Sequence, residues 1–258
     1  MYNRSCQLCP CPLLIGCLRC TEVPSAIRSA NAYLYFFKHE FWKVTIRDVR
    51  RFYSAFVGPG SLVFDVGANI GTHSKIFLSL GASVVAVEPT PSLLEGLRRI
   101  PKLNVEACAL GEAEAKLPLS VSGLHFLNSL VPGWEKRIIG KQDTRIVNVP
   151  VTTLDALIAK YGMPDFIKVD VEGYELKVLS GLSKTAKYLS FEFHTAELEV
   201  AIACVNRLEG CRFNYCLGEA RKFVLPGWVE EEEICSLLRS MPRDWQQVGD
   251  IFAARKLP

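Results

Sequence analysis

Three observations predict an α/β fold with a parallel sheet covered by helices on both faces. From residue 61 onward, apolar strand-like runs alternate with helical segments, which is typical of strand–helix units. The runs are rich in Val, Ile and Phe, as strands buried on both faces are. The chain has 258 residues, of which 49% are hydrophobic and 22% charged, so it is large enough for a sizeable core.

The composition argues against several classes of partner. The net charge of +3 is too small to indicate binding to nucleic acid or to an acidic membrane. No apolar run approaches the roughly 20 residues of a transmembrane helix. The sequence therefore predicts a soluble, cytoplasmic protein with no membrane span and no nucleic-acid partner.

The chain divides into a cysteine-rich leader (1–24), a helical cap (25–60) and an α/β domain (61–258). In the leader, Cys6/Cys9 and Cys17/Cys20 form two C-x-x-C pairs, whose four thiolates can bind zinc. A disordered leader, a zinc or iron–sulfur module and disulfides all stay open. Five further cysteines are expected to be small buried side chains: Cys108, Cys204, Cys211, Cys216 and Cys235.

The cap region mixes aromatic and charged residues, and Pro24 is suited to open a helix. We expect a pair of helices packed on the domain, with an amphipathic membrane-surface helix as the alternative. The sequence Gly58-Pro59-Gly60 then breaks the chain.

The first half of the domain is regular. The predicted elements are a strand and glycine turn at 61–71, a helix at 72–81, a strand at 82–89, a helix at 90–100 and a strand at 103–111. Gly81 is expected to end the first helix. Thr90 is expected to cap the second helix, with Pro91 at its first position.

The second half begins less regularly. Residues 115–150 contain the strand-like pieces 116–121 and 145–151. The elements that follow are a helix at 152–162, a strand at 165–173, a helix at 174–182, a strand at 188–194 and a helical stretch at 195–210. The segments 211–219 and 246–256 are expected to form a final strand pair, separated by the acidic stretch 227–241.

Polar residues collect where the predicted strands end. Ligands of such sheets bind beyond the carboxyl ends of the strands, at the point where the strand order reverses. One crevice should therefore be rimmed by these residues: Asp65, Gly67, Glu88, Asp170, Glu172, Glu192 and His194.

The turn Asp-Val-Gly-Ala-Asn-Ile-Gly after the first strand lets Gly67 and Gly71 approach a ligand closely. It lacks the G-x-G-x-x-G of a dinucleotide site. Glu88 follows Asp65 by 23 residues, where an acid accepts hydrogen bonds from ribose hydroxyls. Asp65 can face the ammonium of an amino-acid moiety, directly or through water. Together they fit S-adenosylmethionine, against the alternative of a turn cap and a solvated acid.

The segments "VFDVGANIGTHSKIFLSLGASVVAVEPTPSLLEGL", "VPVTTLDALIAKYGMPDFIKVDVEGYELKVLSGL" and "YLSFEFH" closely resemble the FkbM-type family of S-adenosylmethionine-dependent methyltransferases. The resemblance covers about residues 60–195. It implies a Rossmann-like class I methyltransferase sheet of seven strands, six parallel and one antiparallel near the end. It also implies methyl transfer to a hydroxyl of a small-molecule acceptor, a sugar or a secondary metabolite.

The resemblance further implies roles for individual residues. Asp65, Gly67, Asn69 and Gly71 would surround the methionine part of the cofactor. Glu88 would bind the ribose. The adenine would lie near Ala109 and Leu110, and the acceptor near Asn128 and Ser129.

Methyl transfer to a hydroxyl also needs an aligned acceptor and a group that takes its proton. Asp170 is the main candidate for the base or the substrate anchor, with Glu172, Glu192 and His194 beside it. Glu172 is expected on the same strand face as Lys168 and Asp170. These four candidates could instead bind a divalent metal, but their spacing does not demand one, so no metal is predicted.

Two residues near the candidates are expected to support them. Lys168 is expected to neutralise part of the acidic cluster. Glu175 falls in a first helical turn, where an acid is favoured structurally.

Two other function classes stay open. A nucleotide-dependent oxidoreductase can be built on the same sheet. A non-catalytic interaction protein could use the cysteine-rich leader as a metal module. The sequence does not identify the acceptor and leaves a homo-oligomer open.

Overall fold

The computed structural model describes residues 46–139, 144–218, 221–245 and 247–255. The cysteine-rich leader and most of the cap lie outside these residues, so the division into three regions stays a prediction. The described part of the cap contains α2 (Ile46–Tyr53). Its Tyr53 is buried and packs with Phe77 and Phe166 of the α/β domain.

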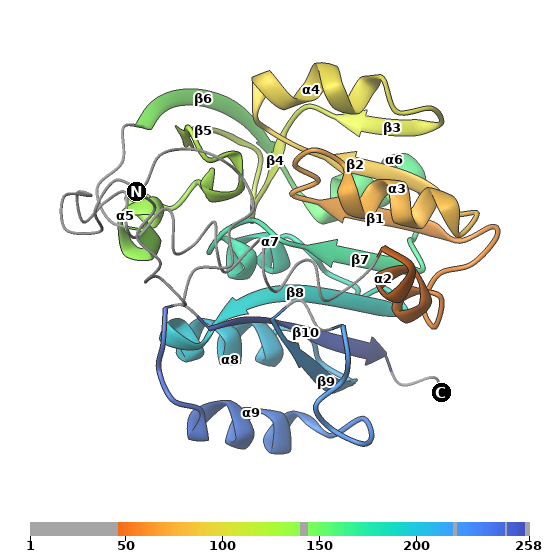
Figure 1. Cartoon of the computed structure of the whole chain (residues 1–258), viewed down its shortest axis with the longest axis vertical. Coiled ribbons are helices and arrows are strands. Elements are labelled where there is room, and N and C mark those ends of the chain that lie inside the picture. The colour runs from red at the N-terminus through yellow and green to blue at the C-terminus, as the bar shows by residue number, and fades with distance from the viewer. Residues whose placement is uncertain (1–45, 140–143, 219–220, 246, 256–258) are drawn as a thin grey trace, which may run out of the picture.

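The centre of the molecule is a seven-stranded sheet with the strand order β3-β2-β1-β7-β8-β10-β9 (Figure 1). The strands are β1 (Leu62–Val66), β2 (Ser83–Val87), β3 (Leu103–Glu106), β7 (Phe166–Val169), β8 (Tyr188–His194), β9 (Cys211–Leu217) and β10 (Val248–Arg255). The pairs from β3 to β8 are parallel, and β10 is antiparallel to both β8 and β9. The mostly parallel seven-stranded sheet, with one antiparallel strand near the end, is confirmed.

Helices cover both faces of this sheet, as predicted (Figure 1). One face packs on α6 (Leu154–Tyr161), α7 (Glu175–Ser180), α8 (Leu198–Asn206) and α9 (Glu231–Ser240). The other face packs on α2, α3 (Thr72–Ser79) and α4 (Pro91–Arg98). The five cysteines of the domain are buried free thiols, as expected from the sequence. Across the described residues, no helix has both the length and the apolar character of a membrane span.

A second, three-stranded sheet stands beside the first (Figure 1). It contains β4 (Ala109–Leu110), β6 (Thr144–Thr152) and β5 (Ala115–Ser122) in that order, with η1 (His125–Leu127) and α5 (Trp134–Ile139) in the connection from β5 to β6. The predicted strand at 103–111 is therefore wrong as a single strand. Its first part joins the main sheet as β3, whereas β4 pairs with Val151 and Thr152 in the second sheet.

Several helix ends follow their local sequence signals. Gly81 has φ 88° and follows Leu80, the C-cap residue of α3, whereas Gly162 has φ 93° directly after α6. The helix α4 begins at Pro91 with Thr90 at the N-cap position, although the Thr90 side chain makes no capping hydrogen bond. Glycine tolerates such left-handed backbone better than other residues do, which explains its use at these ends.

The fourth strand of the alternating series ends earlier than predicted. β7 stops at Val169, and Glu172 has φ 56°, which is left-handed backbone. The period of two along a strand therefore does not extend to Glu172, and its expected place on one strand face with Lys168 is wrong. Asp170 and Glu172 lie instead in the turn that leads from β7 to α7.

Candidate active site

A cavity of about 430 Å³ lies at the carboxyl ends of β1, β2 and β7, against the second sheet. The strand order reverses at this point, because β2 lies on one side of β1 and β7 lies on the other. That point is where ligands bind in open α/β sheets. Of the residues predicted for the site, the cavity is lined by Gly67, Asn69, Glu88, Ala109, Leu110, Asp170, Glu172 and Glu192.

The turn after β1 packs tightly against the turn after β7. Gly67 has φ 81°, and a Cβ atom built on it would lie 1.7 Å from the backbone oxygen of Asp170. A side chain at Gly67 would therefore push the two turns apart. Gly71, by contrast, is not among the residues that line the cavity. A Cβ on Gly71 would meet Ile100 and Leu97, so this glycine allows the start of α3 to pack beside α4.

Glu88 joins the turns after β1 and β2. Its Oε2 accepts a hydrogen bond of 2.8 Å from the Asn69 amide, and its Oε1 accepts one of 2.8 Å from the Thr90 amide. Its side chain lines the cavity but is buried, and burial raises the pKa of the carboxyl group above its ordinary value. Each carboxylate oxygen keeps a further lone pair for a ligand.

Asp65 lies behind the first turn and is not among the residues that line the cavity. It is 1% exposed, and the Ser74 hydroxyl donates a hydrogen bond of 2.5 Å to its Oδ2. Burial raises the pKa of Asp65, and nearby Lys168 opposes that shift. Through its hydrogen bond with Ser74, the Asp65 carboxylate thus holds the first turn of α3 in place. The contact expected between Asp65 and a ligand ammonium, directly or through water, stays a prediction.

The opposite end of the cavity from the acids is largely apolar. Cys108, Ala109 and Leu110 line it at the start of the second sheet, together with Leu119 and Phe126. Such a surface is suited to a flat aromatic group. This is the place that the family resemblance assigns to adenine.

The acidic end is organised around Lys168. Its Nζ lies 2.5 Å from Oδ2 of Asp170, as the sequence-based interpretation expected. Lys168 is 1% exposed, so burial lowers the pKa of its ammonium group. Asp170 and other nearby acids outweigh burial and raise the pKa overall, so Lys168 stays charged. The ion pair holds the Asp170 carboxylate at the cavity wall.

Glu172 is held by two residues from the segment between β5 and β6. The Trp134 indole Nε1 donates a hydrogen bond of 2.9 Å to Glu172 Oε2. The Ser129 hydroxyl donates one of 2.6 Å to the Glu172 backbone oxygen. Burial and the neighbouring Asp170 both raise the pKa of Glu172 well above its ordinary value. The sequence did not predict a role for Trp134 at the site, because no local signal indicates that its indole contacts Glu172, which lies far along the chain.

Glu175 closes the turn after β7. Its Oε1 accepts hydrogen bonds from the backbone amides of Val171 and Gly173, at 3.1 and 3.2 Å. Burial raises the pKa of Glu175 to about 7. These contacts agree with the structural role expected for it.

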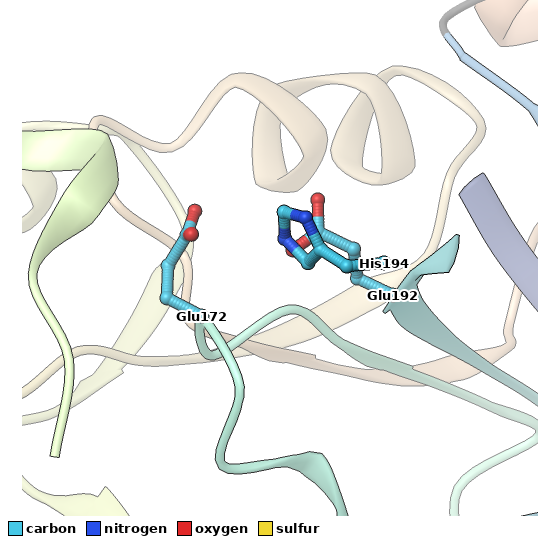
Figure 2. A group of neighbouring side chains, drawn as sticks. All are labelled: Glu172, Glu192 and His194. Atoms are coloured by element: carbon cyan, nitrogen blue, oxygen red, sulfur yellow. The ribbon is translucent and has the colours of Figure 1, made fainter. Parts of the chain in front are cut away.

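Glu192 and His194 extend from β8 toward Glu172 (Figure 2). The distance from His194 Nε2 to Glu192 Oε2 is 3.8 Å. Glu192 lines the main cavity, whereas His194 lies beside Trp134 and lines a small neighbouring cavity. Burial lowers the pKa of His194 to about 4. The four candidate catalytic residues therefore gather at one end of the site, with His194 set back from the main cavity.

Two further charged residues of the cavity were not predicted. Arg221 and Asp250 are both buried, line the cavity and form an ion pair. Asp250 lies on β10 opposite Glu192 of β8. An acid within the apolar strand β10, which lies between β8 and β9, was the available sequence signal for this pair, but the antiparallel register that brings it to the site is not encoded locally.

Asn128 and Ser129, which the resemblance placed near the acceptor, both line the cavity. Asn128 donates a hydrogen bond of 3.2 Å to the Thr90 hydroxyl and accepts one of 2.9 Å from the Ser122 amide. It thereby connects the second sheet to the turn after β2.

Comparison with known proteins gives a consistent family. The family model described as the methyltransferase FkbM domain matches residues 65–242. The hexuronic acid methyltransferase AglP of Haloferax volcanii is 28% identical over 166 residues, which are 59% of this chain. That match spans 64% of the length of AglP.

The comparison with solved structures matches, among others, a precorrin-6y C5,15-methyltransferase from Geobacter metallireducens. It has a TM-score of 0.42 and 12% identity, and the match covers 81% of this chain and 88% of that one. A TehB-like SAM-dependent methyltransferase from Corynebacterium glutamicum has a TM-score of 0.42 and 10% identity, with 89% of this chain and 99% of that one covered.

Proposed function

The chain belongs to the family of methyltransferases with an FkbM domain, and on that premise we propose that it moves a methyl group from S-adenosylmethionine to a hydroxyl of a small molecule, a sugar or a secondary metabolite. One observation carries the proposal. A single cavity is lined both by the turns after β1 and β2 and by a group of acids that includes Asp170, Glu172 and Glu192. The turns suit the cofactor and the acids suit a hydroxylated acceptor.

The lining of the cavity offers contacts for each part of the cofactor. Gly67 lines the cavity, and its lack of a side chain lets this turn pack against the backbone of Asp170; Asn69 follows in the same turn, so both can contact the methionine part. Glu88 offers carboxylate lone pairs to the ribose hydroxyls. Ala109 and Leu110 offer an apolar wall for adenine. Asp65 and Gly71 do not line the cavity, and they act indirectly by positioning the start of α3.

S-adenosylmethionine supplies an already activated methyl group, so the protein's task is to align the acceptor oxygen and take its proton. Asp170 lies at the cavity wall, where its carboxylate can accept a proton from the acceptor hydroxyl. The Lys168 ammonium group fixes the position of that carboxylate. Glu172 and Glu192 add further oxygen atoms that can accept hydrogen bonds from acceptor hydroxyls.

The relative AglP supports a sugar as the acceptor, since it is a hexuronic acid methyltransferase. The family match argues against the oxidoreductase alternative, because most of the α/β domain matches a family of methyltransferases. The interaction-protein alternative depends on the cysteine-rich leader, which lies outside the described residues.

The test is formation of S-adenosylhomocysteine with a panel of free sugars, hexuronic acids and glycosides. We expect turnover with at least one of them and an ether-linked methyl group in the product by mass spectrometry. Asp170→Asn should lower kcat by about 100-fold or more, as loss of a general base does, and leave the cofactor Kd within about threefold. Glu112→Gln, at an exposed ion pair with Lys177, is the matched control. Wild-type kcat in Asp170→Asn at saturating acceptor would remove Asp170 from the mechanism.

A further inference from the structure

Three potential metal-ligating side chains meet beside the main cavity. Glu172 comes from the turn after β7, and Glu192 and His194 come from β8 (Figure 2). One ligand atom from each lies within 4.8 Å of those from the other two. A metal ion holds oxygen and nitrogen ligands at roughly 2.0–2.6 Å, so two ligands of one ion lie at most about 5 Å apart. The three atoms therefore fit around one ion.

The contacts inside this group do not explain why its members are together. The distance of 3.8 Å between His194 Nε2 and Glu192 Oε2 is too long for a hydrogen bond. The His194 side chain is only 5% exposed, and neither of its ring nitrogens has a hydrogen-bond partner of normal geometry. The backbone of Trp245 raises the pKa of His194 as a hydrogen-bond acceptor for one ring nitrogen would, which leaves at least the other ring nitrogen without a partner. Glu192 Oε2 is likewise buried without a partner.

A buried polar atom without a partner is costly, and native proteins rarely keep several of them in one place without a reason. Here the unpartnered atoms of His194 and Glu192 face the same small volume as Glu172 (Figure 2). A bound cation would give each of them a partner at once.

The surroundings hold Glu172 in place before any ligand binds. Trp134 donates to its carboxylate and Ser129 donates to its backbone oxygen. Glu172 itself keeps the unfavourable φ of 56°. Metal sites use such outer contacts to orient their ligands, and strained backbone persists where neighbouring contacts enforce it.

Two positive side chains near this group already form ion pairs with other acids. Lys168 is already paired with Asp170, and Arg221 is already paired with Asp250. Glu172 and Glu192 are half-buried and thus lie together without a positive side chain of their own among these pairs. A divalent ion would balance both carboxylates.

We propose that Glu172, Glu192 and His194 bind one divalent cation that accepts mixed oxygen and nitrogen ligands, such as Mn²⁺. Two carboxylates and one imidazole leave coordination positions open, as in catalytic rather than purely structural sites. Glu172 and Glu192 line the main cavity, so an ion held by them would face the acceptor end. The binding site stands on its own geometry, whereas its use in orienting an acceptor hydroxyl rests on the proposed function.

The experiment is a titration of the full chain with Mn²⁺ alone, followed by electron paramagnetic resonance of the free ion. Mn²⁺ favours oxygen ligands over thiolates, so the cysteine-rich leader does not compete strongly. We expect one bound Mn²⁺ per chain, with nitrogen coupling from His194 in the pulsed spectrum. Glu192→Gln/His194→Gln should bind at least about 100-fold more weakly, and His194→Gln alone should lose the nitrogen coupling.

Glu197→Gln is the matched control, because Glu197 lines the same small cavity as His194 but pairs with Arg137. It should bind Mn²⁺ as the wild type does. Circular dichroism of each variant verifies folding. If folded wild-type protein binds no Mn²⁺ at about 1 mM free Mn²⁺, the proposed site is overturned. Unchanged Mn²⁺ binding by the double variant would overturn it as well. No cofactor or acceptor is present, so either result leaves the methyl-transfer proposal to its own test.

Discussion

At the scale of single residues, Glu88 is the side chain that connects the turns after β1 and β2 to the proposed cofactor site. Removing its carboxylate leaves the Asn69 and Thr90 amides without their acceptor and, under the proposed function, removes the acceptor for the ribose hydroxyls. Charge-assisted hydrogen bonds contribute about 1.5–3 kcal/mol each, so Glu88→Ala should raise the cofactor Kd by about 10-fold or more. Calorimetry with S-adenosylhomocysteine measures this.

Glu95→Ala provides the control for that measurement. Glu95 lies on α4 in an exposed ion pair with Arg99, away from the cavity lining. It should bind the cofactor with wild-type affinity. Equal affinity of Glu88→Ala and Glu95→Ala would contradict the placement of the ribose at Glu88.

Glu175 makes a prediction about stability and pH. Its folded-state pKa of about 7 lies above the ordinary value of 4.5, so the folded state holds its proton more tightly. The stability from this group is complete below pH 4.5 and is lost as the pH rises through 7. The loss amounts to about 3 kcal/mol, because each tenfold difference in proton affinity between the folded and unfolded states corresponds to about 1.4 kcal/mol. The Glu175→Gln variant should not lose this stability, because glutamine carries no proton to release.

Urea unfolding of both proteins between pH 4.5 and 8, with a chelator present, measures the effect. The variant should gain stability relative to the wild type as the pH rises, because the Gln side chain does not ionise. Comparing the two proteins cancels the titration of the other acids. A stability difference that is independent of pH would show that Glu175 ionises normally in the folded protein.

At the scale of elements, the turn between β7 and α7 is shaped by the segment between β5 and β6. Gly173 has φ 88°, and a Cβ there would lie 2.3 Å from the Trp134 ring. Left-handed backbone costs a non-glycine residue about 1–2 kcal/mol, before the clash is counted. Gly173→Ala should therefore lower the free energy of unfolding by about 2 kcal/mol or more and alter the Trp134 fluorescence.

Gly123→Ala is the comparison, because a Cβ at Gly123 meets nothing within 4 Å and its φ is not left-handed. Urea unfolding with tryptophan fluorescence follows both variants. The same unfolding curve for the two alanine variants would mean that Trp134 does not need the space at Gly173.

The elements that the sequence predicted well are those with local signals. Glycine at 81 and 162 and proline at 91 mark helix ends within a few residues. The second sheet was not predicted as a sheet, because Ala109 pairs with Val151, more than 40 residues later. The early end of β7 escaped prediction for the same reason: the contacts that hold Glu172 come from a distant segment.

At the scale of the whole molecule, the alternation of strands and helices was enough to predict which residues reach the carboxyl edge of the sheet. Ten of the predicted site residues line one cavity there, eight of them candidate cofactor-binding or catalytic residues and the other two Asn128 and Ser129. Asp65, Gly71 and His194 lie just behind it, since side-chain direction at a strand end depends on neighbours that periodicity does not specify. Arg221 and Asp250 were missed because the last strand pair brings them in from far along the chain.

Every role in methyl transfer that is proposed for these residues depends on S-adenosylmethionine binding in this cavity. Calorimetric titration of the full chain with S-adenosylmethionine and S-adenosylhomocysteine, with NADH as the control ligand, measures that binding directly. We predict saturable binding of the first two at one site per chain and no binding of NADH. A demonstrably folded protein that binds neither of the first two, or that binds NADH in their place, would show that the cavity is not a site for this cofactor.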